Sequence, residues 1–266
     1  MTTLLRFVHI SDTHINPDTS YIKHGAPTPL AGTKALVEAV NALPFQPDFI
    51  LHTGDVVYDP YPEAYSAAEA AFEPLKAPVY YMAGNHDDCG GLQRILLNRT
   101  EDVVTPYLYY QMEINGVQLV VLDSNGPAED PTGNIPHEQL LWLEEIVSAE
   151  DTRPLLVAVH HNLMPVGAPW LDDWMRTNNG EAVHGLLMQA GPRLRAVLHG
   201  HIHQNTVNYK DGVLYVSAAS SWTQFMSYPT PENTEVTHDP TAQPGFNVVH
   251  VTTDGISIRT HQFQVR

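Results

Sequence analysis

Five segments of the chain share one pattern, in which an apolar run stops at polar side chains able to bind a metal ion. The runs lead into Asp12 and His14, into Gly54 and Asp55, into Asn85 and His86, into His160 and His161, and into His201 and His203. In an α/β sheet, the loops that leave the carboxyl ends of parallel strands line the crevice where ligands bind. Carboxylate, amide and imidazole donors together suit divalent transition metals, so the pattern predicts a metal site at one rim of a sheet.

The five motifs are weak singly and strong in combination. Short Asp-x-His or Gly-Asp combinations arise by chance, whereas Asn85 inside Gly-Asn-His-Asp is more informative. A neutral amide ligand adds an oxygen without cancelling the positive charge that an anionic substrate needs. His160 directly follows its strand, so it is favoured over His161 as the ligand, and we interpret His199 as a strand-end side chain.

Composition restricts the class of substrate. A chain of 266 residues can hold one large α/β domain or two small ones, and without a Pro/Gly/Ser-rich linker a single domain over residues 1–266 is expected. With 30 acidic and 13 basic residues, the formal net charge is −17. Such a surface repels a nucleic-acid backbone or an anionic bilayer, so we expect a small substrate and neither extended nucleic acid nor membrane as a partner.

The expected location is the cytoplasm. A single cysteine, Cys89, excludes an internal disulfide and suits a reducing compartment. The first apolar run leads directly into Asp12, so no signal peptide is expected. No apolar run approaches the ~20 residues that a membrane span requires.

The order of the predicted elements indicates the fold class. Strands are expected at 4–10, 48–52, 79–82, 155–160 and 196–199, with helices at 28–43, 62–72, 91–97, 136–148 and 180–189. Turn pairs at 115–116, 211–212 and 254–255 predict three hairpins. The pattern predicts an α/β sandwich of two mixed sheets with helices outside. The C-terminal hairpins, about 206–266, would complete the second sheet, and 222–246 is a candidate lid or homodimer element.

From Asp12 to His203 the motifs together resemble the calcineurin-like metallophosphoesterase superfamily, and among its members the class III cyclic nucleotide phosphodiesterases and their glycerophosphodiesterase relatives. The resemblance implies a four-layer α/β/β/α sandwich and a two-metal site. It implies that metal one is held by Asp12, His14, Asp55 and His203. It implies that metal two is held by Asp55, Asn85, His160 and His201.

This arrangement implies a hydrolase for small phosphodiesters, such as cAMP or glycerophosphodiesters. Two cations about 3.5–4 Å apart need a bridging anion, which Asp55 would supply, and a hydroxide bridging them would attack phosphorus. Mixed nitrogen and oxygen ligation suits Mn, Fe, Co or Zn without choosing among them. A phosphomonoesterase or pyrophosphohydrolase is the alternative enzyme, and a non-catalytic scaffold is disfavoured because every ligand position is intact.

His86 is the expected catalytic residue, on the side of the leaving group. It would protonate the departing alkoxide or hydrogen-bond the phosphoryl oxygens; the alternative is that it only orients the metal ligands. In the calcineurin-like phosphatases that act on proteins, an Asp at this position is the partner of this His. The chain has Tyr58 there, so Asp59 or Asp87 would have to be the partner of His86.

Four aromatic residues flank the last ligands and are candidates for stacking on a base or lining the leaving-group pocket. All four are expected in loops: Trp170, Trp174, Trp222 and Phe225.

Overall fold

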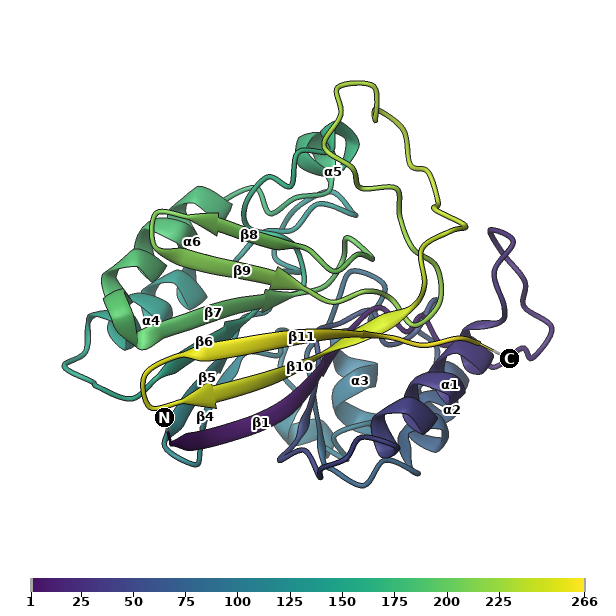
Figure 1. Ribbon diagram of the computed structural model, residues 1–266, viewed down its shortest axis with the longest axis horizontal. Helices are drawn as coiled ribbons and strands as arrows, with labels where there is room; N and C mark the ends of the chain where they lie inside the picture. The colour runs from purple at the N-terminus through teal and green to yellow at the C-terminus, as the bar shows by residue number, and fades with distance from the viewer. Residues whose placement is uncertain (1, 266) are drawn as a thin grey trace.

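The computed structural model describes residues 2–265 and arranges them as two β-sheets packed face to face between two layers of helices (Figure 1). The first sheet has the strand order β11-β10-β1-β2-β3, and the second has the order β4-β5-β6-β7-β9-β8. In Figure 1, α1, α2 and α3 cover the first sheet, and α4 and α6 cover the second. The four-layer sandwich of mixed sheets that the sequence predicted is confirmed. The expectation that both C-terminal hairpins complete the second sheet is wrong: the hairpin with its turn at 211–212 lies in the second sheet, but the hairpin with its turn at 254–255 lies in the first, where β10 pairs with β1.

The predicted helices and strands occur in the predicted order along the chain. The strands are β1 (Thr3–Ile10), β2 (Ile50–His52), β3 (Val79–Tyr81), β4 (Tyr110–Ile114), β5 (Val117–Val121), β6 (Leu155–Ala158), β7 (Leu194–His199), β8 (Val207–Lys210), β9 (Val213–Ser217), β10 (Gly245–Thr252) and β11 (Ile256–Gln262). The α-helices are α1 (Pro29–Asn41), α2 (Pro62–Phe72), α3 (Cys89–Ile95), α4 (His137–Ser148), α5 (Pro169–Trp174) and α6 (Gly180–Leu187), with 3-10 helices η1 (Glu101–Val103) and η2 (Met188–Arg193).

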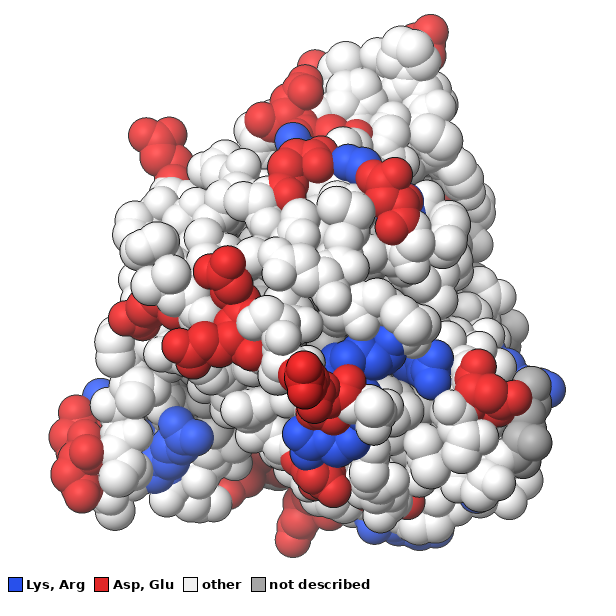
Figure 2. Space-filling model, turned by 90° about the vertical axis from the view of Figure 1, so that its left-hand side faces the viewer, with Lys and Arg blue, Asp and Glu red and all other residues white. Residues whose placement is uncertain are grey.

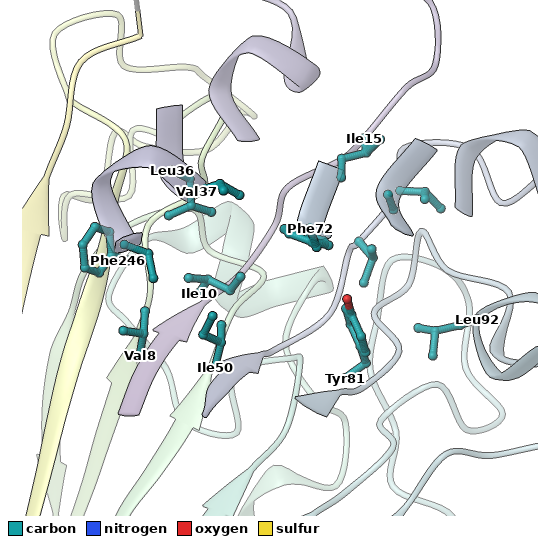
Figure 3. Packing of buried hydrophobic residues seen from close by; sticks show 14 of the residues in the cluster. Val8, Ile10, Ile15, Leu36, Val37, Ile50, Phe72, Tyr81, Leu92 and Phe246 are labelled. Atoms are coloured by element: carbon teal, nitrogen blue, oxygen red, sulfur yellow. The ribbon is translucent and has the colours of Figure 1, made fainter. Parts of the chain in front are cut away.

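Strand β1 is buried on both faces because its side chains alternate between two cores. Val8 and Ile10 point toward the helices, where they pack with Leu36 of α1 and Phe72 of α2 (Figure 3). Phe7, on the other face, belongs to the core between the two sheets.

The core between the sheets fixes their relative position. The ring of Phe7 stacks on that of Phe49, with the centroids 4.5 Å apart. Leu119 of β5, Leu156 of β6 and Leu198 of β7 face this layer from the second sheet. Removal of this apolar surface from water stabilises the packing of the two sheets, by roughly 25 cal/mol for each Å² buried. The parallel strands β1–β3 and β5–β7 then end close to one another.

Two helices begin on signals that the sequence carries. The Thr28 hydroxyl accepts a hydrogen bond from the Ala31 N–H, and Pro29 occupies the first turn of α1. The Asp88 carboxylate accepts from the Gly91 N–H at 2.6 Å and starts α3 directly after the Asn85 motif.

The structure corrects the expected position of two aromatic residues. Trp170 and Trp174 lie on the short helix α5, where the sequence predicted a loop. Pro169 at its first turn is a start signal, but the run is too short for helical periodicity to show. Much of the 222–246 segment is irregular, with an isolated bridge between Phe225 and His238. Its role as a lid or dimer element stays a prediction.

On the face shown in Figure 2, acidic side chains cover more of the surface than Lys and Arg do. This agrees with the formal net charge of −17. On that face there is no continuous basic surface of the kind that tracks a nucleic-acid backbone. Among residues 2–265, no helix is both long and apolar enough to cross a bilayer.

His9 makes the stability of the fold dependent on pH. It lies buried between the sheets, with Nε2 3.0 Å from the Thr53 hydroxyl. Burial, with His199 and His52 nearby, lowers its pKa from 6.5 to about 3. Between these two values the unfolded chain binds a proton that the folded chain does not. Stability therefore falls as the pH decreases from about 6.5 toward 3, and this group has no effect above that window.

We expect His9→Gln, which keeps hydrogen-bonding capacity without titrating, to weaken this dependence. Between pH 7.5 and 5, the metal-free variant should lose about 2 kcal/mol less unfolding free energy than the wild type, from ~1.4 kcal/mol per pH unit below 6.5. Urea unfolding at both pH values measures this, with exposed His137→Gln as the matched control. An unchanged pH dependence in His9→Gln would contradict the assignment.

Candidate metal centre

All seven predicted ligands lie at the carboxyl ends of parallel strands, as the sequence predicted. Asp12 and His14 follow β1, Asp55 follows β2, Asn85 follows β3, His160 follows β6, and His201 and His203 follow β7. Six are buried, and Asn85 is partly buried. The two sheets thus contribute to one cluster, because their core brings these strand ends together.

Asp55 lies between two groups of donors. Its Oδ2 is 3.5 Å from Nε2 of His14, and its Oδ1 is 3.4 Å from Nε2 of His160. The two carboxylate oxygens therefore face different imidazoles, one from each sheet. This is the geometry that a carboxylate shared by two cations requires.

The first group consists of Asp12, His14, Asp55 and His203, whose ligand atoms all lie within 4.8 Å of one another. Nε2 of His14 is 2.9 Å from Nε2 of His203, which is 3.4 Å from Oδ1 of Asp12. Ligands bonded at about 2.0–2.2 Å to one metal lie roughly 3.0–3.5 Å apart. The spacing therefore fits a metal ion.

The second group is centred on His160. Ring nitrogens of His160, His161 and His201 lie within 4.8 Å of one another. Nε2 of His160 is also 3.2 Å from Oδ1 of Asn85. Together with Oδ1 of Asp55, these atoms supply the mixed nitrogen and oxygen set expected for a second ion.

Hydrogen bonds on the outer side of the cluster orient the imidazoles. Nδ1 of His160 donates to the Thr53 carbonyl at 2.7 Å, and Nδ1 of His203 donates to the Thr223 carbonyl at 2.7 Å. Each bond leaves the Nε2 lone pair facing the cluster. Nε2 of His201 and Nε2 of His161 are both buried and have no hydrogen-bond partner within residues 2–265, so each nitrogen can bind a metal ion.

Five of the seven predicted ligands have a strained backbone conformation. Asp12, His14, Asp55, His201 and His203 all have positive φ, between 44° and 67°. This region is unfavourable for residues other than glycine, and such strain concentrates at functional sites. The loop after β3 approaches so closely that a Cβ on Gly84 would overlap Oδ1 of Asp55.

The ionisation states favour metal binding. Burial opposes the charge on Asp55, but His160 and His86 outweigh it and hold its pKa well below the usual range. Burial keeps the pKa values of His14 and His201 well below 6.5, so both imidazoles are neutral at pH 7, the form that binds metals. For His160, Asp55 overcomes burial and raises the pKa to about 9, so this residue releases a proton when it binds a metal.

His86 is oriented by a backbone carbonyl. Its Nδ1 donates to the carbonyl oxygen of Tyr58 at 2.7 Å, and its own backbone N–H donates to Oδ1 of Asp55 at 2.9 Å. Its ring lies 4.7 Å from the ring of His14, so Nε2 is available beside the cluster.

The two carboxylates considered as partners of His86 do not fill that role. Within the described residues, neither Asp59 nor Asp87 hydrogen-bonds the His86 ring. Asp87 accepts from the backbone N–H groups of Gly84, Val56 and Val57 at 2.9–3.3 Å, which ties the loops after β2 and β3 together. Burial and the nearby Asp55 raise the pKa of Asp87 to about 7.

A cavity of about 320 Å³ opens over the cluster. Its lining includes His14, Asp55, Asn85, His86, His201 and His203. Trp174, Trp222 and Phe225 also line it, whereas Trp170 is buried against Phe225, with the two rings 5.2 Å apart. Three of the four aromatic candidates therefore reach the cavity.

The cavity also has residues that the sequence did not single out. Lys23 and His24 come from the loop between β1 and α1, and His238 comes from the 222–246 segment. These loops lack periodicity or a motif, so nothing in the sequence indicated that they meet at the site.

Comparison with known proteins identifies the family. Residues 5–205 match the calcineurin-like phosphoesterases. The chain is 30% identical to the 3',5'-cyclic adenosine monophosphate phosphodiesterase CpdA of Pseudomonas aeruginosa, over 93% of this chain and 86% of that protein. It is 29% identical to a cAMP/cGMP dual specificity phosphodiesterase of Mycobacterium tuberculosis, over 94% of this chain and 76% of that protein.

A solved structure agrees on the fold. The dimetal phosphatase from Danio rerio superposes with a TM-score of 0.67 at 14% identity, covering 98% of this chain and 96% of that one. The chain belongs to the calcineurin-like phosphoesterase family. The relatives named above are phosphodiesterases, in agreement with the activity that the sequence predicted, and the Asp and His clusters of this chain are able to hold metal ions.

The structure makes His160 and His161 a matched pair for a test of metal binding. Nδ1 of His161 shares a hydrogen bond with the Ser124 hydroxyl at 2.7 Å, whereas Nε2 of His160 faces both Asp55 and Asn85. We expect His160→Ala to lose about one metal ion per chain, measured by plasma emission spectrometry after dialysis. His161→Ala should keep the wild-type metal content; the reverse result would exchange their roles.

Proposed function

We propose that the protein hydrolyses 3',5'-cyclic nucleotides at a centre of two metal ions. Metal one is held by Asp12, His14, Asp55 and His203. Metal two is held by Asp55, Asn85, His160 and His201. The observation that carries the proposal is the placement of the two Asp55 oxygens toward separate donor groups, beneath a cavity of about 320 Å³.

The cavity suits a small ester with a flat group. Small-ligand sites typically occupy about 300–1,000 Å³ and are lined by aromatic side chains with a few polar groups. Trp222, Phe225 and Trp174 provide aromatic surface beside the donor clusters. The relatives named as cyclic nucleotide phosphodiesterases support this substrate class.

The charge of the ligand set suits a phosphodiester. Asp12 and Asp55 contribute two negative charges, while Asn85 and the neutral imidazoles contribute none. When bound, the two divalent cations lower the pKa of water and neutralise charge on the phosphoryl group. Since their four positive charges exceed the two negative charges of the carboxylates, the site attracts an anionic ester.

His86 acts on the leaving group. The Tyr58 carbonyl fixes the proton on Nδ1, so the other nitrogen, Nε2, can carry a proton toward the departing ester oxygen. Asp55 and the Tyr58 carbonyl, which together outweigh burial, raise the pKa of His86 and favour the protonated form that a general acid needs.

The ions proposed for these sites are Mn, Fe, Zn or Co, because mixed nitrogen and oxygen donors suit all four. Anaerobic purification followed by metal analysis identifies the ions. We propose a cytoplasmic location on the grounds given by the sequence, and the 222–246 segment stays a candidate lid or homodimer element.

Substrate class is tested by comparing esters at defined metal content. We expect the metal-loaded protein to hydrolyse 3',5'-cAMP or 3',5'-cGMP, and bis(p-nitrophenyl) phosphate faster than p-nitrophenyl phosphate, measured as kcat/KM. Glycerophosphodiesters form the comparison panel. Faster turnover of the monoester would instead support a phosphomonoesterase. Loss of all turnover after chelation, restored by Mn²⁺, is the control for metal dependence.

Replacement of His86 separates catalysis from metal binding. His86→Gln removes the proton carrier, and we expect kcat for cAMP to fall by about 10²–10⁴-fold, the usual contribution of general acid–base catalysis. Metal content should remain that of the wild type. With p-nitrophenyl esters, whose leaving group needs no proton, the loss should be much smaller. An equal loss on both substrates would assign His86 to orientation of the ligands.

A further inference from the structure

The cavity over the donor clusters contains a side chain with a permanent positive charge, that of Lys23. Among residues 2–265, no other Lys or Arg lines this cavity. The rest of its polar lining consists of imidazoles, the Asn85 amide, the Thr223 and Tyr58 hydroxyls and the carboxylates Asp55 and Asp130.

Tyr58 holds the Lys23 ammonium in place. Nζ of Lys23 donates a hydrogen bond to the Tyr58 hydroxyl and lies 4.4 Å from the ring centroid. The Tyr58 ring is itself wedged between His86, at 5.0 Å, and Trp222, at 5.7 Å. The same residue thus orients His86 through its carbonyl and Lys23 through its hydroxyl.

The ammonium has hydrogen-bonding capacity to spare. An ammonium has three donors, and within the described residues the only hydrogen bond of Lys23 Nζ goes to Tyr58. None of the salt bridges formed within residues 2–265 involves Lys23. Two donors are therefore available to a ligand, and a lysine directed into a cavity without a carboxylate partner is suited to bind an anion.

The neighbouring imidazoles do not supply a competing charge. His24 and His238 stack with their centroids 3.7 Å apart next to Lys23. Burial, with the nearby Lys23, lowers the pKa of His24, and burial, with His24 beside it, lowers that of His238 to about 4. Both rings are neutral at pH 7, so Lys23 is the cation on this wall of the cavity.

We propose that Lys23 is a substrate-binding residue whose ammonium, positioned by the Tyr58 hydroxyl, contacts a non-bridging oxygen of the phosphoryl group bound in the cavity. The ligand class is a phosphate ester, or its phosphate product. The proposal rests on phosphoester hydrolysis at the donor clusters, but not on cyclic nucleotides being the substrate.

The test measures anion binding directly as well as turnover. Lys23→Met removes the charge and keeps the length of the side chain, and Lys23→Arg keeps the charge. Lys34→Met is the matched control, because Lys34 is exposed on α1 and lines none of this cavity. Each metal-loaded variant is titrated with inorganic phosphate by calorimetry and assayed with bis(p-nitrophenyl) phosphate, after its metal content has been matched to the wild type.

For Lys23→Met we expect a dissociation constant for phosphate and a KM each raised about tenfold, the loss of one charged hydrogen bond, with kcat changed less than about threefold. Lys23→Arg should restore most of the binding, and Lys34→Met should match the wild type. Tyr58→Phe, which keeps the carbonyl that orients His86, should weaken phosphate binding in the same direction by a smaller factor.

Phosphate binding and KM unchanged in both Lys23→Met and Tyr58→Phe would overturn the proposal. Equal losses in Lys23→Met and Lys23→Arg would also overturn it, because they would show that the shape of the side chain matters and its charge does not. The probe is a synthetic diester, so an absence of cyclic nucleotide turnover would refute the proposed substrate while leaving this test intact.

Discussion

The structure depends on one carboxylate that faces two ways. Asp55 lies 3.5 Å from an imidazole delivered by β1 and 3.4 Å from one delivered by β6, so it joins donors from both sheets. A buried carboxylate is costly unless opposite charge compensates it. Here the surrounding imidazoles hold its pKa low, and they leave a concentration of ligand atoms that matches the spacing around metal ions.

The two-sheet core is what makes this arrangement rigid. Phe7, Phe49 and the leucines of the second sheet fill the layer between the sheets and leave little freedom for one sheet to slide over the other. Five ligand residues adopt positive φ at the strand ends. Such backbone strain persists only where surrounding structure over-determines it, and the packed strands provide that support.

The fold and the site carry different kinds of information. The dimetal phosphatase structure with this fold shares only 14% identity with the chain, a level at which fold alone is informative. The donor clusters define the chemistry, while the cavity walls define what fits. Those walls come largely from loops, including the segment with Lys23 and the 222–246 segment, and they give the site its aromatic surface and the permanent charge of Lys23.

The sequence by itself determined the donors and the order of the elements. Asp12, Asp55, Asn85 and His201 each follow an apolar run, which predicted that they lie at the carboxyl edge of a sheet. The core between the two sheets then brings both edges together. Helix starts such as Thr28-Pro29 were equally local. These features need only neighbours in the chain, which is why periodicity and spacing revealed them.

Only the tertiary structure decided how the donors and the walls are arranged. That the Tyr58 carbonyl orients His86, in place of Asp59 or Asp87, depends on how the loops after β2 and β3 pack together. Trp170 is buried and Trp174 lines the cavity because both lie on α5, a helix too short to be predicted from a periodic sequence pattern. Each is set by contacts between residues distant in the chain, and a local sequence pattern contains no information about such contacts.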